Sequence, residues 1–199
     1  MAQPSTAQHE KFQLVTELVD KLETDHQAAV ARIKTKIDTM VNSFKNVAYL
    51  DMVQCAIESL EGDIKPNLKR GHSCLGGICE ELQDTLAEAK ELMEKGEKEK
   101  VYDRVGKAWG DLNYEKDEYY FMFESSLSPF YEEYELHDLE KESEDDMNEH
   151  QLNEHRVQVQ LKELYKELWQ TFIDGFEENG MRELLRELDE LQDLFGSNE

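Results

Sequence analysis

Apolar residues return every three or four positions along the first part of the chain, and residues 5–61 contain neither glycine nor proline. The members of this pattern are Phe12, Val15, Val19, Leu22, His26, Ala29, Ile33, Ile37, Met40 and Phe44, followed by Val47, Leu50, Val53, Ile57 and Leu60. The steps form a heptad seam, with two steps of four meeting at Ile33 as a stutter. Ser5 and Gln8 have the spacing of a capping box. The pattern predicts a long coiled-coil-like helix, or a bent helix pair, over 5–61.

The remaining chain predicts further helices separated by glycine and proline. Residues 62–77 hold four glycines and one proline, and they are predicted to form a Gly/Cys loop that ends the first helical unit. Within 78–199, Gly96 interrupts one helical pattern and Ser128–Pro129 resembles the start of another. No strand pattern is evident. The sequence therefore predicts one all-α domain over 1–199, an elongated bundle of five or six helices.

A seam this narrow must be covered by another helix. The covering helix could come from the same chain, or a second copy could pair with the seam in a homodimer. His26 occupies a core position of the seam and is interpreted as a polar residue that sets the register.

The charge balance is strongly acidic, with 46 Asp and Glu against 22 Lys and Arg and a formal net charge of −24. This balance argues against binding to nucleic acid or to anionic membranes, both of which need a basic surface. The densest part is an acidic stretch at 131–155, predicted to be either a solvated helix or a loop. No apolar run is long enough for a membrane span. A basic protein partner, a divalent cation or simply high solubility all fit this charge.

Half of the 18 aromatic residues lie within 109–134. Because the run from Tyr119 to Phe123 points side chains in every helical direction, one face is expected to pack inside and another to meet a partner. The predicted partner contacts are Trp109, Tyr119, Tyr120, Phe123, Phe130, Tyr131 and Tyr134.

No catalytic or cofactor motif stands above background. Cys55, His72, Cys74 and Cys79 match no common zinc-finger spacing, and the one Glu-x-x-His match, at Glu23 and His26, lacks the second copy that a di-iron bundle needs. The odd number of cysteines favours a reducing, cytoplasmic location. In a secreted protein lacking its signal peptide, two of Cys55, Cys74 and Cys79 would form a disulfide.

These observations predict a non-enzymatic, acidic helical protein that acts as a protein–protein interaction module without a cofactor or metal. Two alternatives remain open. One is a secreted helical protein that binds an extracellular or host protein, or a small hydrophobic ligand. The other is an acidic chaperone or mimic for basic partners.

Overall fold

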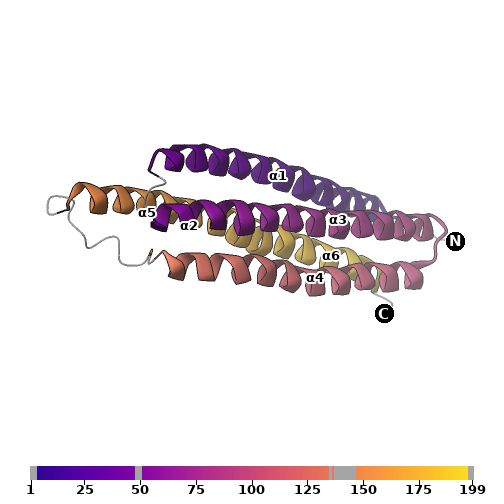
Figure 1. Ribbon diagram of the computed structural model, residues 1–199. Helices are drawn as coiled ribbons and strands as arrows, with labels where there is room; N and C mark the ends of the chain where they lie inside the picture. Colours follow the sequence, from indigo (N-terminus) through magenta and orange to yellow (C-terminus); the bar gives the residue numbers. More distant parts are fainter. Residues whose placement is uncertain (1–3, 48–50, 135, 137–146, 197–199) are drawn as a thin grey trace. The chain divides into compact units, whose positions relative to one another are not determined.

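A computed structural model describes residues 4–47, 51–134, 136 and 147–196 (Figure 1). These residues are almost entirely helical and include no strand. The elements are α1 (Thr6–Phe44), η1 (Lys45–Val47), α2 (Asp51–Ser59), η2 (Leu60–Ile64), α3 (Lys65–Glu94), α4 (Lys98–Glu133), α5 (Glu149–Leu168), η4 (Trp169–Met181) and α6 (Arg182–Gly196). The all-α prediction is confirmed.

Several of these elements follow one another without a break. The π-type turns of η2 join α2 directly to α3, and those of η4 join α5 directly to α6. The described residues therefore form four continuous helical stretches, and the predicted count of five or six helices is not confirmed. The capping box of Ser5 and Gln8 is confirmed, since each backbone N–H donates to the other residue's side chain at 2.9 and 3.3 Å.

The loop predicted for residues 62–77 is wrong, because the chain stays helical there. Pro66 lies in the first turn of α3, just after η2. In that π-type segment the Lys65 N–H donates to the Leu60 carbonyl, five residues back. Gly71 serves close packing instead of a turn, since a Cβ built there would lie 2.5 Å from the Phe123 ring.

The interruption predicted at Gly96 is confirmed. Gly96 has a φ of 76°, a left-handed conformation that favours glycine. Its N–H donates to the Met93 carbonyl at 2.9 Å, and the Glu97 N–H donates to the Leu92 carbonyl at 3.0 Å. These two bonds satisfy the last carbonyls of α3 in the Schellman pattern.

A helix start predicted at Ser128–Pro129 is also wrong, because Pro129 lies inside α4. The buried neighbours Leu127 and Phe130 supply packing that offsets the lost backbone hydrogen bond. The next helix begins at Glu149, where Asn148 and Gln151 form a capping box. Within the acidic stretch 131–155, residues 135 and 137–146 lie outside the described residues.

The chain divides into two compact units, each with an apolar core. Unit 1 consists of Met1–Gln27, Ser73–Tyr120 and Gly175–Glu199, and unit 2 of Ala28–His72 and Phe121–Asp174. Buried residues of unit 1 include Phe12, Val15, Val19, Leu22, Leu75, Leu82, Leu86, Val101, Val105, Leu112, Leu184, Leu188 and Leu191. Those of unit 2 include Ile33, Ile37, Phe44, Leu60, Leu68, Phe123, Leu127, Leu161, Leu164, Leu168 and Phe172.

The seam of α1 is buried within the chain's own units, but its register differs from the prediction. Val30 is buried where Ala29 was expected, so the two steps of four meet at His26 instead of Ile33. The seam is thus covered within the chain itself. The homodimer that the sequence left open as an alternative is not shown by the structure.

Two glycine substitutions test whether residues 62–77 are helical. Gly77 is an exposed helical residue with open space around its Cα, so Gly77→Ala should raise the free energy of unfolding by about 0.5–1 kcal/mol. Gly71→Ala should lower it by about 1–3 kcal/mol, because the new methyl group would collide with Phe123. Urea unfolding followed by circular dichroism measures both. A loss of stability in Gly77→Ala would contradict helix at that position.

Candidate protein-binding surface

Four of the seven predicted partner contacts lie in the core. Tyr119, Phe123, Phe130 and Tyr134 are each at most 3% exposed. Phe123 stacks on Phe172 with ring centroids 4.8 Å apart, and burial raises the pKa of Tyr134 to about 12. This corrects the sequence prediction: these four side chains stabilise the two units and are not available to a partner.

The other three predicted contacts reach the surface only in part. Trp109 is about one-third exposed, and Tyr120 and Tyr131 are half-buried. Tyr131 also packs against Tyr165, with ring centroids 4.7 Å apart. The large apolar side chains that the structure does expose are mostly different ones: Leu14, Tyr102, Tyr114, Phe121, Val159 and Leu194.

Leu14 and Leu194 line one groove of about 440 Å³ between α1 and α6 in unit 1, here called the α1/α6 groove. Its lining residues are Ala7, Glu10, Lys11 and Leu14 from α1 and Glu190, Asp193 and Leu194 from α6. Sequence reasoning missed this site because Leu14 and Leu194 lie off the heptad seam and off the buried stripe of α6. The sequence feature that could have identified them is an apolar residue that lies outside the periodic pattern of each helix.

The two helices that form the groove are fixed to each other by specific contacts. Phe12 and Phe195 pack edge to face beneath them, with ring centroids 6.0 Å apart. The Gln8 side-chain amide donates to the Leu194 carbonyl at 3.1 Å, near the end of α6. These contacts join the two helices that form the groove.

Lys11 forms the main ion pairs beside the groove. Its ammonium donates to Glu187 at 2.6 Å and to Glu190. Burial lowers the pKa of Lys11, but these two hydrogen bonds outweigh it, so the pKa is raised overall. The hydrogen bond from Lys11, supported by one from Arg186, lowers the pKa of Glu187. Lys11 is thus held by α6, and three carboxylates line the groove with this one ammonium.

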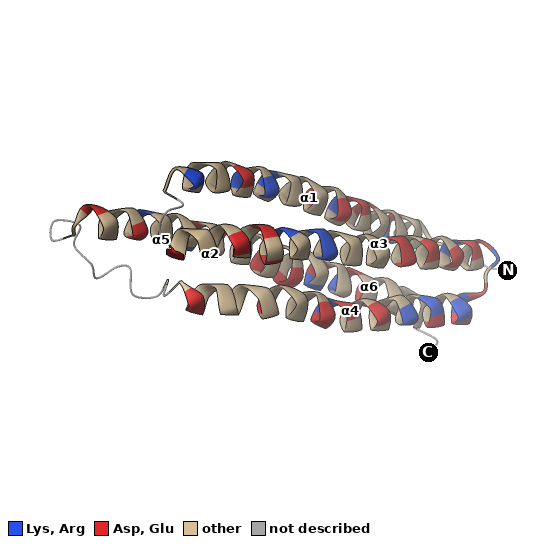
Figure 2. Cartoon of the chain, in the orientation of Figure 1, with Lys and Arg blue, Asp and Glu red and all other residues tan. Residues whose placement is uncertain are grey.

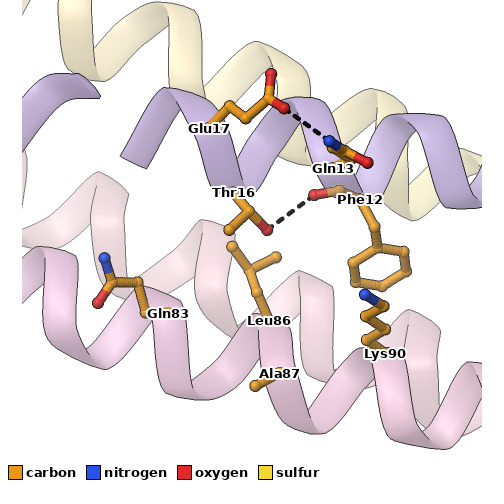
Figure 3. Close-up of a pocket in the computed structure, with 8 residues that line it drawn as sticks. All are labelled: Phe12, Gln13, Thr16, Glu17, Gln83, Leu86, Ala87 and Lys90. Atoms are coloured by element: carbon orange, nitrogen blue, oxygen red, sulfur yellow. Dashed lines mark hydrogen bonds between the residues drawn. The ribbon is translucent and has the colours of Figure 1, made fainter. Parts of the chain in front are cut away.

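A second hollow of about 360 Å³ lies between α1 and α3, also in unit 1 (Figure 3). Figure 3 shows Phe12, Gln13, Thr16 and Glu17 on one helix and Gln83, Leu86, Ala87 and Lys90 on the other. Phe12 and Leu86 are almost fully buried and form its apolar floor. Gln13 donates to Glu17 at 2.8 Å along the rim.

A polar cluster lies in the core of unit 1. His26 is fully buried, and its Nε2 is 2.8 Å from the Tyr119 hydroxyl. The Phe176 ring contacts the imidazole edge to face, with centroids 4.8 Å apart. Nearby in the same unit, Lys116 pairs with buried Glu177 at 3.2 Å. These groups lie inside the protein and not on a surface that a macromolecule reaches.

The three cysteines are free thiols in the structure: Cys55 is exposed, Cys74 half-buried and Cys79 buried. Burial raises the pKa of Cys74, and the carboxylates of Glu115 and Glu118 add to this effect. Burial, together with Glu23 and Asp20, raises the pKa of Cys79 to about 12. The disulfide expected for a secreted protein does not occur here.

Figure 2 shows acidic residues along all of the labelled helices. Among the described carboxylates only Glu177 and Glu187 are buried, so the acidic excess lies at the surface. The described residues include no group of three or more His, Cys, Asp or Glu side chains placed to hold a metal ion. None of the described helices combines the length and apolar character that crossing a bilayer requires.

Comparison with known proteins found no matching family model, no matching curated protein and no matching solved structure.

The thiols should react in order of their exposure and ionisation. Iodoacetamide at pH 8 should alkylate exposed Cys55 first, Cys74 more slowly and Cys79 only after unfolding. A pKa of about 12 leaves roughly one Cys79 thiol in ten thousand ionised at pH 8. Timed quenching and peptide mass spectrometry measure the three rates. Equal rates for Cys55 and Cys79 in the folded protein would refute this order.

Proposed function

We propose that this chain is a non-enzymatic protein–protein interaction module, a coiled-coil-like helical bundle that binds basic partner proteins. The observation that carries the proposal is the placement of its charge. The sequence holds 46 acidic and 22 basic residues, and of the described carboxylates only two are buried. The surface therefore carries a strong negative field that attracts basic proteins and repels acidic ones.

Exposed apolar side chains within this acidic surface support the proposal. Affinity at protein interfaces depends on a few desolvated apolar anchors, whereas charge mainly sets partner choice and association rate. Leu14, Leu194, Tyr114 and Phe121 are such anchors, each at least 40% exposed. The same properties would suit an acidic chaperone or mimic for basic proteins, which is a variant of this function.

Binding of a small hydrophobic ligand is a second candidate, favoured by the hollow between α1 and α3. Its volume of about 360 Å³ lies within the range of ligand sites, and its floor of Phe12 and Leu86 is apolar. This candidate corresponds to the alternative of a ligand-binding secreted protein.

Salt should weaken binding if charge selects the partner. A fluorescent lysine-rich amphipathic helical peptide should bind the protein with a Kd about tenfold higher in 300 mM than in 50 mM NaCl, because salt screens exposed charges. Fluorescence anisotropy measures this binding. A peptide with the same apolar positions and glutamate in place of lysine is the control and should not bind. Equal binding of the two peptides, or a Kd independent of salt, would exclude a basic partner.

The ligand candidate has a separate test. Nile red is a neutral apolar dye whose emission rises in apolar surroundings, and it should bind the wild-type protein with an emission increase. Ala87→Leu should reduce that increase several-fold by filling the hollow from its rim. The control, Gly110→Ala, changes an open position of α4 that is not part of the hollow. An unchanged signal in Ala87→Leu would exclude the hollow as a ligand site.

A further inference from the structure

The hollow between α1 and α3 has an elongated apolar floor. Phe12 and Leu86 form this floor, and Ala87 adds a methyl group at the rim. The lining residues on α3 run from Gln83 to Lys90, a span of about 10 Å at ~1.5 Å per residue. An extended chain of about eight carbons, with C–C bonds of about 1.5 Å, has a similar length. The hollow therefore has the dimensions of a short apolar chain.

Most polar side chains around this hollow are already bonded within the protein. The Gln13 amide donates to Glu17 at 2.8 Å, and the Thr16 hydroxyl donates to a backbone carbonyl of the preceding turn at 2.9 Å (Figure 3). On α3, the Gln83 amide donates to Asp20 at 2.7 Å. These groups hold the rim together and leave little hydrogen-bonding capacity for a ligand.

Lys90 is the remaining polar side chain among the described lining residues. It makes no hydrogen bond or ion pair with any residue in the described part of the chain. Figure 3 shows its side chain reaching from α3 toward the Phe12 ring, at one end of the floor. Glu17, the one carboxylate among these lining residues, is turned along α1 toward Gln13. The hollow thus presents an unpaired ammonium beside an apolar surface.

We infer that the hollow between α1 and α3 binds a small amphipathic carboxylate, an assignment that rests on ligand binding as the second candidate function. The carboxylate would pair with the Lys90 ammonium, and the apolar chain would lie over Phe12 and Leu86. A neutral ligand fits less well, because it would cover part of the ammonium without replacing its hydrogen bonds to water.

The acidic surface selects the source of this ligand. At an ionic strength of about 0.15 M, exposed charges farther away than about 8 Å are largely screened, so the adjacent ammonium acts more strongly on a small anion than distant carboxylates do. An anionic bilayer presents many charges over a wide area, and a chain with a net charge of −24 repels it. The ligand is therefore a free molecule in solution and not a lipid within a membrane.

Two ligands with the same apolar chain test the role of charge. Octanoate carries a carboxylate, whereas octan-1-ol is neutral, and both should displace Nile red from the wild-type protein. Lys90→Gln removes the ammonium, so octanoate should be needed at an about three- to fivefold higher concentration. Octan-1-ol should displace the dye equally from both proteins. Each concentration is corrected for the Kd of Nile red in the same protein.

Two further variants separate charge from shape. Lys90→Arg keeps a cation at the end of the floor and should retain the octanoate affinity of the wild type. Lys98→Gln removes the same charge from an exposed position of α4 outside the hollow, and it should also behave like the wild type. Circular dichroism should show the same fold for all variants, because both lysines are exposed. Equal weakening of octanoate by Lys90→Gln and Lys98→Gln would overturn the assignment of Lys90.

The outcomes distinguish failure of the ligand class from failure of the site. If Nile red does not bind the wild type, or Ala87→Leu leaves its signal unchanged, the candidate function and this inference both fail. If Nile red binds as expected and octanoate displaces it equally from the wild type and Lys90→Gln, the site stands and the anionic class is wrong. Sedimentation with vesicles of an anionic phospholipid is the last check. Cosedimentation that Lys90→Gln abolishes would make a membrane lipid the occupant and overturn the inference.

Discussion

Helix α1 carries one narrow apolar seam that it cannot bury by itself, and the rest of the structure follows from covering it. Buried residues of α3, α4 and α6 belong to the same unit as the first part of the seam, and buried residues of α2, α3, α4 and α5 belong to the same unit as the rest of it. His26 is the exception along the seam, and the Tyr119 hydroxyl gives its buried Nε2 a hydrogen-bond partner. The same residue marks the place where the spacing of the seam changes. A shift of α1 would separate this polar pair, so the pair favours the observed register.

The acidic excess is compatible with this fold because nearly all of the carboxylates that the structure describes remain in water. Long helices with a buried stripe leave most of their circumference exposed, and that surface receives the carboxylates. Where a carboxylate is buried, a cation accompanies it: Lys116 beside Glu177 and Lys11 beside Glu187. These pairs avoid the cost of an isolated buried charge.

Local sequence patterns predicted the helical class, the N-terminal cap and the turn at Gly96, because these features depend on residue spacing and backbone geometry. The prediction from local sequence was wrong over 62–77, where four glycines suggested a loop. At Gly71 the cause is tertiary: the Phe123 ring occupies the space that a side chain would need. The prediction of partner contacts from the aromatic cluster was wrong for a related reason. Composition gives the number of aromatic residues, but which of them face the core depends on the helices packed around α4, as Tyr119 and Phe123 show.

Separate faces of the same helices carry stability and the proposed binding. On α1, Phe12 and Val15 belong to the core while Leu14 faces the groove, and on α6, Leu191 and Phe195 are buried while Leu194 is exposed. The backbone positions of Leu14 and Leu194 are therefore set by interactions that a partner does not have to form. A preorganised groove loses little conformational entropy on binding, so even a small apolar contact can be effective. Such a division lets the groove vary in charge and shape without loss of the fold.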